Sequence, residues 1–320
     1  MPYATSNSYW GAAVESTYGT PASVSTFTPI DSPKVVPTLM WLNDASFRGS
    51  PVTNYDQVPG VIHATFDGKT YMYSDVYPQL LRAALGSTDT VASVGAGAST
   101  HTIGLLNAPN TGSQSPSYTI INDSVDNTYS ITGSRLVDMS LSFAADGAVE
   151  TTFSFTGNAA SIAASVAVNE SAQHFVPAWN CGASIGGTSV AVVESAQLDI
   201  KRGTAPIYTL GQQGPYNNFQ GPLEVAGSFV FVVEASEAFY ANSLIRQQQQ
   251  LLLNFVDPVT TNYVLFQMSN IQLEDPIIDQ SKNYITLQTK FVAVANATDQ
   301  VTGGYSPLKT VTKNGVSTAY

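Results

Sequence analysis

Residues 135–157 read RLVDMSLSFAADGAVETTFSFTG, and this stretch decides the fold class. Apolar and polar side chains alternate from 137 to 143 and again from 149 to 156. Between these runs lies Asp146-Gly147, a dipeptide typical of tight turns. Alternation on both sides of such a turn predicts a β-hairpin with one buried face and one solvated face. The predicted buried face is aliphatic and aromatic, and the solvated face carries Ser, Thr and two acids.

The same alternation returns nearer the C-terminus. Residues 267–274 read QMSNIQLE, with Ile271 and Leu273 on the apolar side. After a longer connection, residues 285–291 alternate again, with Leu287 and Phe291 among the apolar positions. This pattern predicts a second hairpin of the same polarity, about one domain length downstream.

Length and composition bound the class of protein. The chain has 320 residues, a length that suggests about two domains. Charged residues make up only 11% of the chain, against roughly 25% in average soluble proteins. A surface so poor in charge indicates that partners cover much of it, and it is also common in extracellular β-proteins and virion proteins. The net charge of −11 argues against binding nucleic acid through its phosphates, which requires a basic surface.

Signals for disulfides, membranes and export are missing from the sequence. Cys181 is the single cysteine, which excludes an internal disulfide, and we interpret it as a small apolar side chain rather than a nucleophile. No apolar run of about 18 residues predicts a transmembrane helix. The opening MPYATSNSYW contains no signal segment. We therefore expect synthesis in a cytoplasm, no membrane insertion and no export by the ordinary secretory route.

The order of predicted elements repeats in the two halves. Each half has a strand, a loop, a strand entered through a glycine (Val58-Pro59-Gly60 and Val225-Ala226-Gly227), one helix, short strands and the polar-faced hairpin. The helices are predicted over 74–86 and from Ser236 to about Gln250. Because the two halves share little sequence identity, the match lies in order and pattern. This predicts an N-terminal arm at 1–33, a first β domain at 34–160, a second at 161–297 and a C-terminal arm at 298–320.

Candidate catalytic and metal-binding residues do not form a constellation. His63, His101 and His174 are scattered, with no spacing typical of metal ligands. Asp138 and Glu150 lie on neighbouring predicted strands, and we interpret them as acids on a solvated face rather than a catalytic pair. No nucleophile elbow, phosphate-binding loop or zinc-protease motif occurs. The sequence therefore predicts no enzyme, no cofactor and no metal site.

Open sheet edges predict self-assembly instead. Two strand-rich units leave unpaired edges, which are a hazard unless they are paired or covered. Joining the sheets of several subunits into one barrel removes those edges. The two terminal arms and the loop at 203–222 are the natural elements to reach neighbouring subunits.

Several stretches resemble a known family. These are WGAAVESTYGTPAS at 10–23, VPGVIHATFDG at 58–68, YPQLLRAALG at 77–86 and the hairpin itself. In them the chain resembles the tail tube protein (major tail protein) of long, non-contractile-tailed bacteriophages. The resemblance implies a mainly β fold of two tandem β-sandwich or half-barrel tail-tube domains, each with one flanking helix. It also implies rings whose inner sheets join into a continuous β-barrel, and rings that stack into a hollow tube for DNA.

The duplication changes the expected ring. Most family members carry one such unit and form six-membered rings, so a chain with two units implies a homotrimer with pseudo-sixfold symmetry. The resemblance further implies a location in the virion of a siphophage, after synthesis in the host bacterial cytoplasm. The implied partners are other copies of the chain, the tape measure protein, the tail terminator and the distal tail protein. DNA passes through during ejection without specific binding.

The hairpins supply candidate site residues. A DNA conduit must not hold phosphates, because each Lys or Arg contact adds salt-dependent affinity. The solvated faces are acidic to neutral apart from Lys290, so we predict that they line the channel, although they could face outward. The predicted lumen-lining residues are Asp138, Ser140, Ser142, Glu150, Thr152, Ser154, Gln272, Glu274, Thr286 and Gln288. The predicted ring-stacking loop contributes Tyr208, Tyr216, Asn217 and Phe219.

Two other classes of function compete with this interpretation. A two-domain β-sandwich adhesin or glycan-binding module would use Tyr208, Tyr216 and Phe219 to bind sugars, and it would not polymerise. A hydrolase on a β-scaffold has no supporting motif. The related tubes of contractile tails and secretion machines are a nearer alternative, distinguished by a sheath protein encoded beside the tube protein.

Overall fold

A computed structural model describes residues 8–320 apart from 26, 96, 108–113, 125, 168, 172, 191 and 234–247. The chain is mainly β, as predicted. Within the described residues there is one α-helix, and eighteen strands are joined by hydrogen bonds into one sheet system. The elements of the first half are β1 Tyr9–Val14, β2 Phe27–Thr28, β3 Asp31–Asp44, β4 Asp56–Tyr71, α1 Tyr77–Leu85, β5 Thr90–Gly95, β6 Ala98–Gly104, β7 Tyr118–Ser124, β8 Asn127–Ala144, β9 Glu150–Gly157 and β10 Ser161–Ala163. Those of the second half are a 3-10 turn Ala178–Asn180, β11 Cys181–Ile185, β12 Thr188–Val190, β13 Val193–Lys201, β14 Ala205–Ile207, β15 Asn217–Phe219, β16 Glu224–Val232, β17 Gln249–Val256, β18 Tyr263–Asp279, β19 Thr286–Ala293 and β20 Lys309–Asn314.

The first predicted hairpin is confirmed as β8 and β9, with Ser142 opposite Glu150. The predicted apolar positions of both strands are buried, with one exception on β8. A register shift between Leu136 and Asp138 inserts an extra residue, so Leu136 enters the core and Val137 stays partly exposed. Such a bulge is invisible to a strict alternation pattern.

The second predicted hairpin and the first helix are also confirmed. β18 and β19 pair antiparallel. Helix α1 has proline in its first turn and ends at Gly86, whose φ of 88° is the left-handed conformation that favours glycine. It begins at Tyr77, slightly later than predicted. The second predicted helix lies mostly outside the described residues, and its predicted end at Gln250 is wrong because β17 already begins at Gln249.

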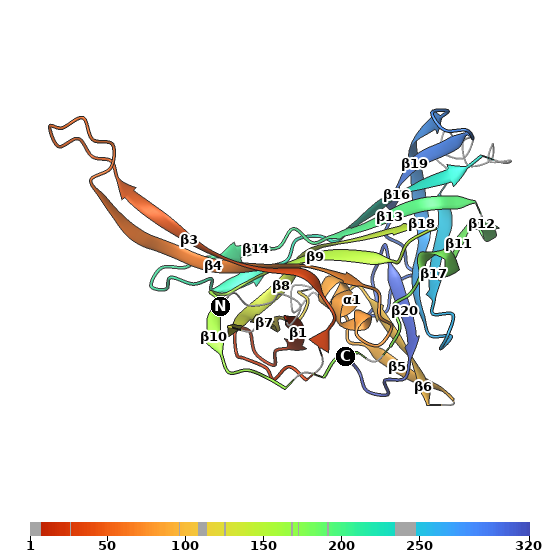
Figure 1. Ribbon diagram of the computed structural model, residues 1–320, viewed down its shortest axis with the longest axis horizontal. Coiled ribbons are helices and arrows are strands. Elements are labelled where there is room, and N and C mark those ends of the chain that lie inside the picture. The colour runs from red at the N-terminus through yellow and green to blue at the C-terminus, as the bar shows by residue number, and fades with distance from the viewer. Residues whose placement is uncertain are drawn as a thin grey trace.

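Two long strands connect two layers (Figure 1). The C-terminal parts of β8 and β18 belong to a broad sheet in the order β3-β4-β9-β8-β13-β16-β19-β18. Their N-terminal parts lie in a second layer, where β8 pairs with β7 and β10, and β18 pairs with β17 and β20. Helix α1 lies beneath the broad sheet, where Tyr77 hydrogen-bonds Thr151 of β9 at 3.0 Å. A large cluster of buried apolar residues fills the space between the layers, and a small second cluster contains Val24, Phe27 and Ile121.

The broad sheet contains the same strand arrangement twice. Neighbours run β3-β4-β9-β8 in the first series and β13-β16-β19-β18 in the second. In the lower layer, β1 pairs with β7 as β11 pairs with β17. β10 flanks β8 as β20 flanks β18.

A glycine–phenylalanine pair marks equivalent places in the two series. Gly68 of β4 lies opposite Phe153 of β9, and Gly227 of β16 lies opposite Phe291 of β19. A Cβ atom added at either glycine would lie within 3 Å of the facing phenylalanine ring. The sequence comparison aligned Gly227 with Gly60, but the strand register makes Gly68 its counterpart, because only there does a ring occupy the space of the missing side chain.

The terminal segments contain strands as well as irregular chain. Trp10 on β1 is buried against Phe66 and Phe153, and β1 pairs with β7. The carboxylate of Glu15 accepts hydrogen bonds from the backbone N–H groups of Gly19 and Gly133, both at 2.8 Å. β20 pairs with β18 on one side and β6 on the other, so it links the two halves. The sequence missed these strands because their partners are distant; the four-part domain division remains a prediction.

We predict that Gly227→Ala lowers the free energy of unfolding of the unassembled chain by roughly 1–3 kcal/mol, the usual cost of overpacking. The new methyl group would lie 2.2 Å from the backbone carbonyl oxygen of Gln197 and 2.5 Å from Phe291, so backbone must move. Denaturant unfolding measures the change. Gly214→Ala is the matched control, because nothing lies within 4 Å of its added Cβ. Equal stability of the two variants would contradict the prediction.

Candidate functional site

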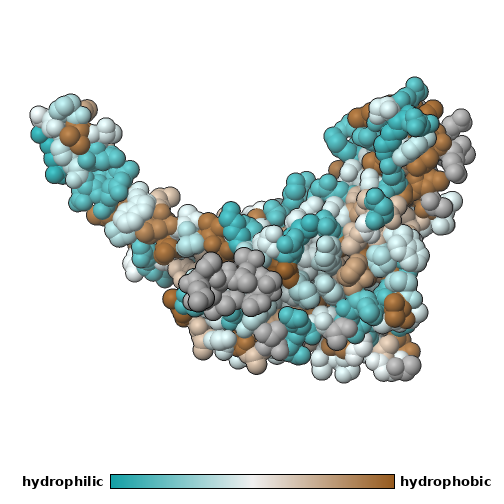
Figure 2. Space-filling model, viewed as in Figure 1, coloured by the Kyte–Doolittle hydropathy of each residue, from teal (hydrophilic) through white to brown (hydrophobic). Residues whose placement is uncertain are grey.

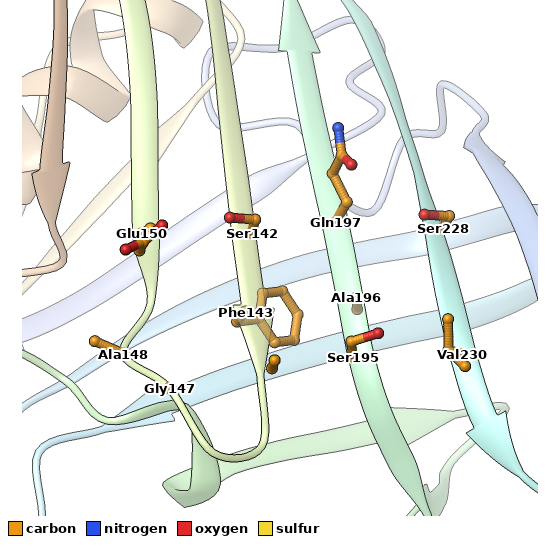
Figure 3. A pocket seen from close by; sticks show the side chains of 11 residues that line it. Ser142, Phe143, Gly147, Ala148, Glu150, Ser195, Ala196, Gln197, Ser228 and Val230 are labelled. Atoms are coloured by element: carbon orange, nitrogen blue, oxygen red, sulfur yellow. The ribbon is translucent and has the colours of Figure 1, made fainter. Parts of the chain in front are cut away.

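The polar positions of both hairpins lie on one face of the broad sheet. Residues directly opposite each other in a β-ladder project to the same side. One such row crosses six strands without a break, through β9, β8, β13, β16, β19 and β18. It consists of Glu150, Ser142, Gln197, Ser228, Lys290 and Glu274. Figure 3 shows the first four of these side chains side by side.

We call the whole surface the polar face. Its members share the register positions of this row and of the parallel rows beside it. They are Asp67, Lys69, Asp138, Ser140, Ser142, Glu150, Thr152, Ser154, Gln197, Asp199, Lys201, Glu224, Ser228, Gln272, Glu274, Gln288 and Lys290. The opposite side of the same strands packs on α1 and the core, so the polar face is the hollowed upper side of the molecule between β3–β4 and β19 (Figures 1 and 2).

The predicted lumen residues are brought together here, with one exception. Asp138, Ser142, Thr152, Glu274 and Gln288 are exposed, and Ser140, Glu150, Ser154 and Gln272 are partly exposed. Thr286 is only 1% exposed, so its side chain does not contribute to the accessible surface of the single chain. The lumen role itself stays a prediction for all of them.

The sequence analysis missed the middle of this face. Gln197, Asp199 and Lys201 alternate with the buried Ala196, Leu198 and Ile200 along β13. This alternation was available as a signal, because it predicts a strand with one polar side. What it could not reveal is that β13 pairs with β8 and thereby joins the two hairpins.

The lysines on the polar face have acidic neighbours. Lys69 forms an ion pair with Glu150 at 2.9 Å, and Lys290 forms one with Asp275 at 3.2 Å. Lys201 lies opposite Asp138. Exposed ion pairs contribute only about 0–1 kcal/mol to stability, so their main effect is to neutralise the cations.

Acids outnumber bases on this face. Its acids are Asp67, Asp138, Glu150, Asp199, Glu224 and Glu274, and its lysines are Lys69, Lys201 and Lys290. The edge strand β3 extends the same rows with one more acid, Asp31, and one more lysine, Lys34. Partial desolvation and then the nearby Asp67 raise the pKa of Asp138 above its usual range, although Lys201 opposes the shift. Desolvation is the largest cause of this pKa shift, and the neighbouring carboxylates of Asp67 and Asp199 add to it because like charges disfavour the ionised form.

A small pocket on the polar face contains few groups that could take part in catalysis. It has a volume of about 440 Å³ and is lined mainly by small side chains, with Glu150 as its one charged residue. Among the residues described, no group of His, Cys, Asp and Glu is arranged to hold a metal. Burial raises the pKa of the Cys181 thiol to about 12, so it stays protonated and is a poor nucleophile.

A second surface projects from the body. β3 and β4 pair with each other beyond the point where β9 ends (Figure 1). We call residues 37–63 the arm, which is distinct from the terminal arms predicted at 1–33 and 298–320. Figure 2 shows separate apolar patches along a mostly hydrophilic arm. The exposed large apolar side chains of the arm are Met40, Trp41, Leu42, Phe47, Val52 and Val58. Trp41 is 54% exposed and Phe47 fully exposed. Several large apolar side chains exposed on one projection mark an interaction site.

The predicted stacking loop braces the base of the arm. Tyr208 Oη lies 2.9 Å from His63 Nδ1, and the backbone N–H of Ile62 donates to the carbonyl of Gln213 at 3.0 Å. Asn217 accepts a hydrogen bond from the buried Arg135. Tyr216 and Phe219 remain 64% and 47% exposed. The loop therefore supports the arm and still presents two aromatic side chains.

Comparison with known proteins identifies the class. A family model described as phage tail tube protein matches residues 5–311. A search of curated proteins found no match. In the part of the chain that the structure describes, no helix is both long enough and apolar enough to cross a membrane.

Proposed function

We propose that this chain, which belongs to the phage tail tube protein family, is the subunit of a hollow tail tube and that its polar face lines the channel. The observation that carries the proposal is the unbroken polar row across both halves of the chain. A single chain thus supplies one continuous arc of channel wall. This family membership does not favour the adhesin alternative.

The charge of the polar face suits a DNA conduit. A passing duplex meets carboxylates, hydroxyls and amides, and it meets lysines whose charge is offset by neighbouring acids. Phosphates therefore gain little by stopping, because retention by ion pairing requires free Lys or Arg. The excess of acids adds a weak repulsion that keeps the DNA near the axis.

The ring, in this proposal, contains three chains. The two strand series with equal order and equivalent Gly–Phe pairs support a duplicated tail-tube unit. Three such chains supply six quasi-equivalent units and give a homotrimer with pseudo-sixfold symmetry. Joining the outer strands of neighbouring broad sheets then closes the barrel and satisfies the open edges.

The arm and the loop at 203–222 form the contact between rings. They connect equivalent strand pairs, β3–β4 and β13–β16, yet the arm projects and the loop folds back on its base. Each chain therefore offers one long apolar projection for two units. We expect three arms per ring, each covered by chains of the next ring.

The remaining features of the proposal follow from the family. The assembled protein belongs to the virion tail of a siphophage after synthesis in the host cytoplasm. The tape measure protein occupies the channel before DNA ejection, and the tail terminator and distal tail protein close the two ends.

Electron microscopy of the purified protein tests the main proposal. We expect hollow tubes, with three chains per ring in averages viewed down the axis. Six chains per ring would keep the tube and overturn the duplicated ring. Discrete particles that never polymerise at high concentration would overturn the tail tube function.

Extra lysines on the polar face should slow DNA, because Glu150, the acid opposite Ser142, already forms an ion pair with Lys69. We expect Ser142→Lys combined with Gln197→Lys to leave tubes intact, because both side chains are exposed on the polar face. Triggered ejection from phage carrying both changes should be slower, and added salt should restore the rate, since phosphate contacts are salt-dependent. Ser142→Gln is the neutral control. An unchanged rate in verified double-lysine tubes would count against a lumen role.

Removing apolar side chains from the arm should stop stacking without unfolding the chain. We expect Trp41→Ser with Phe47→Ser to yield folded protein that forms no long tubes, because both residues lie outside the core. Burying two such side chains contributes about 3–6 kcal/mol per arm. Sedimentation and negative-stain microscopy measure tube length. Thr53→Ser on the same arm is the control, and long tubes from the double variant would contradict the assignment.

A further inference from the structure

We infer that two neighbouring subunits are joined by the same kind of strand pairing that joins β8 to β13 within the chain. In this joint, β3 of one subunit lies antiparallel to the C-terminal part of β18 of the next subunit. In that register Lys34 lies opposite Glu274 of the second copy. The inference rests on the proposed tube, and it adds which edges meet and in which alignment.

Both edges are open in the described residues. β3 pairs with β4 on one side only. The N-terminal part of β18 has β17 and β20 on its two sides, whereas from Gln272 onward β19 is its one neighbour among the described residues. An unpaired edge exposes backbone N–H and C=O groups that a second strand can satisfy.

The chain already contains the joint that such edges would make. β8 pairs with β9 on one edge and with β13 on the other. β18 holds the position of β8 in the second series, and β3 holds the position of β13 in the first. The partner missing from β18 is therefore a strand in the position of β3, and the nearest such strand belongs to a second copy.

Equivalent residues set the alignment. Phe153 lies opposite Met139, and its counterpart Phe291 lies opposite Leu273. The next residue after Met139 on β8 is Ser140, and the next residue after Leu273 on β18 is Glu274, so Glu274 is the counterpart of Ser140.

The equivalent glycines Gly68 and Gly227 align the other edge. Asp67, which precedes Gly68, pairs with Lys34 of β3. Ala226, which precedes Gly227, pairs with Asp199 of β13, so Lys34 is the counterpart of Asp199. Since Ser140 lies opposite Asp199 within the chain, Glu274 lies opposite Lys34 between chains.

The chemistry of this pair favours the alignment. Ser140 Oγ donates to Asp199 at 2.5 Å in the internal joint, and the external joint replaces this hydrogen bond by opposite charges. Lys34 and Glu274 are both exposed in the single chain. A slip of two residues would set Lys34 opposite Gln272 or Pro276 and leave the charges unmatched. Pro37 and Pro276 limit the joint to a short length, as proline does on edge strands.

Paired cysteines test the register in assembled tubes. In the same alignment Val36 lies opposite Gln272, so Val36→Cys with Gln272→Cys, in a Cys181→Ser background, should cross-link neighbouring chains on oxidation. Val35→Cys with Gln272→Cys is the control, because adjacent strand residues project to opposite faces. We expect covalent oligomers from the first pair and at least tenfold less from the second.

Failure of the proposed register and failure of the proposed tube function give different results. Parent tubes with cross-linking only in the control pair, or in neither pair, would overturn the register and leave the tube function standing. A parent chain that forms no tubes would overturn the proposed function and this inference together.

A charge exchange keeps the test decisive if the cysteine variants do not assemble. Glu274→Lys should reduce tube yield at low salt, and adding Lys34→Glu should restore it. If the double variant assembles no better than Glu274→Lys alone, the Lys34–Glu274 pairing is wrong.

Discussion

The backbone hydrogen bonds between β8 and β13 are the interaction on which the rest of the molecule depends. They join two strand series of equal order into one broad sheet. Without them the two polar-faced hairpins would be separate surfaces, and no row of side chains would cross the chain. Because opposite residues in a ladder project to the same side, the joint aligns the polar positions of both halves automatically.

The two sides of this sheet carry different requirements. The inner side needs close packing, and the Gly68–Phe153 and Gly227–Phe291 pairs show how closely the backbones and rings approach there. The polar face, in the proposed tube, needs a surface that does not bind DNA. Its acids outnumber its lysines, and the lysines have acidic neighbours. One strand pattern therefore serves stability on one side and, in the proposed tube, free passage of DNA on the other.

The two halves differ most in how equivalent strands are connected. β3 and β4 continue as a long arm with exposed apolar side chains, whereas the connection between β13 and β16 folds back and hydrogen-bonds the arm at Ile62 and Gly60. A two-stranded ribbon is only marginally stable by itself, so this bracing holds the arm in a defined direction. In the proposed duplicated unit, one connection is thus free to support the other, which a chain with a single unit cannot do.

The sequence by itself determined both hairpins, the first helix and the family. Alternation around Asp146-Gly147 and along 267–274 predicted both hairpins, and the helix predicted over 74–86 is α1, which ends at Leu85 before Gly86. Only the tertiary structure decided which strands are neighbours. It joined β8 to β13, buried Thr286, shifted Leu136 into the core and made Gly68 rather than Gly60 the counterpart of Gly227. The physical reason is that side-chain periodicity acts within a strand, whereas pairing uses backbone groups that are alike in every residue, so the choice of partner depends on packing between distant parts of the chain.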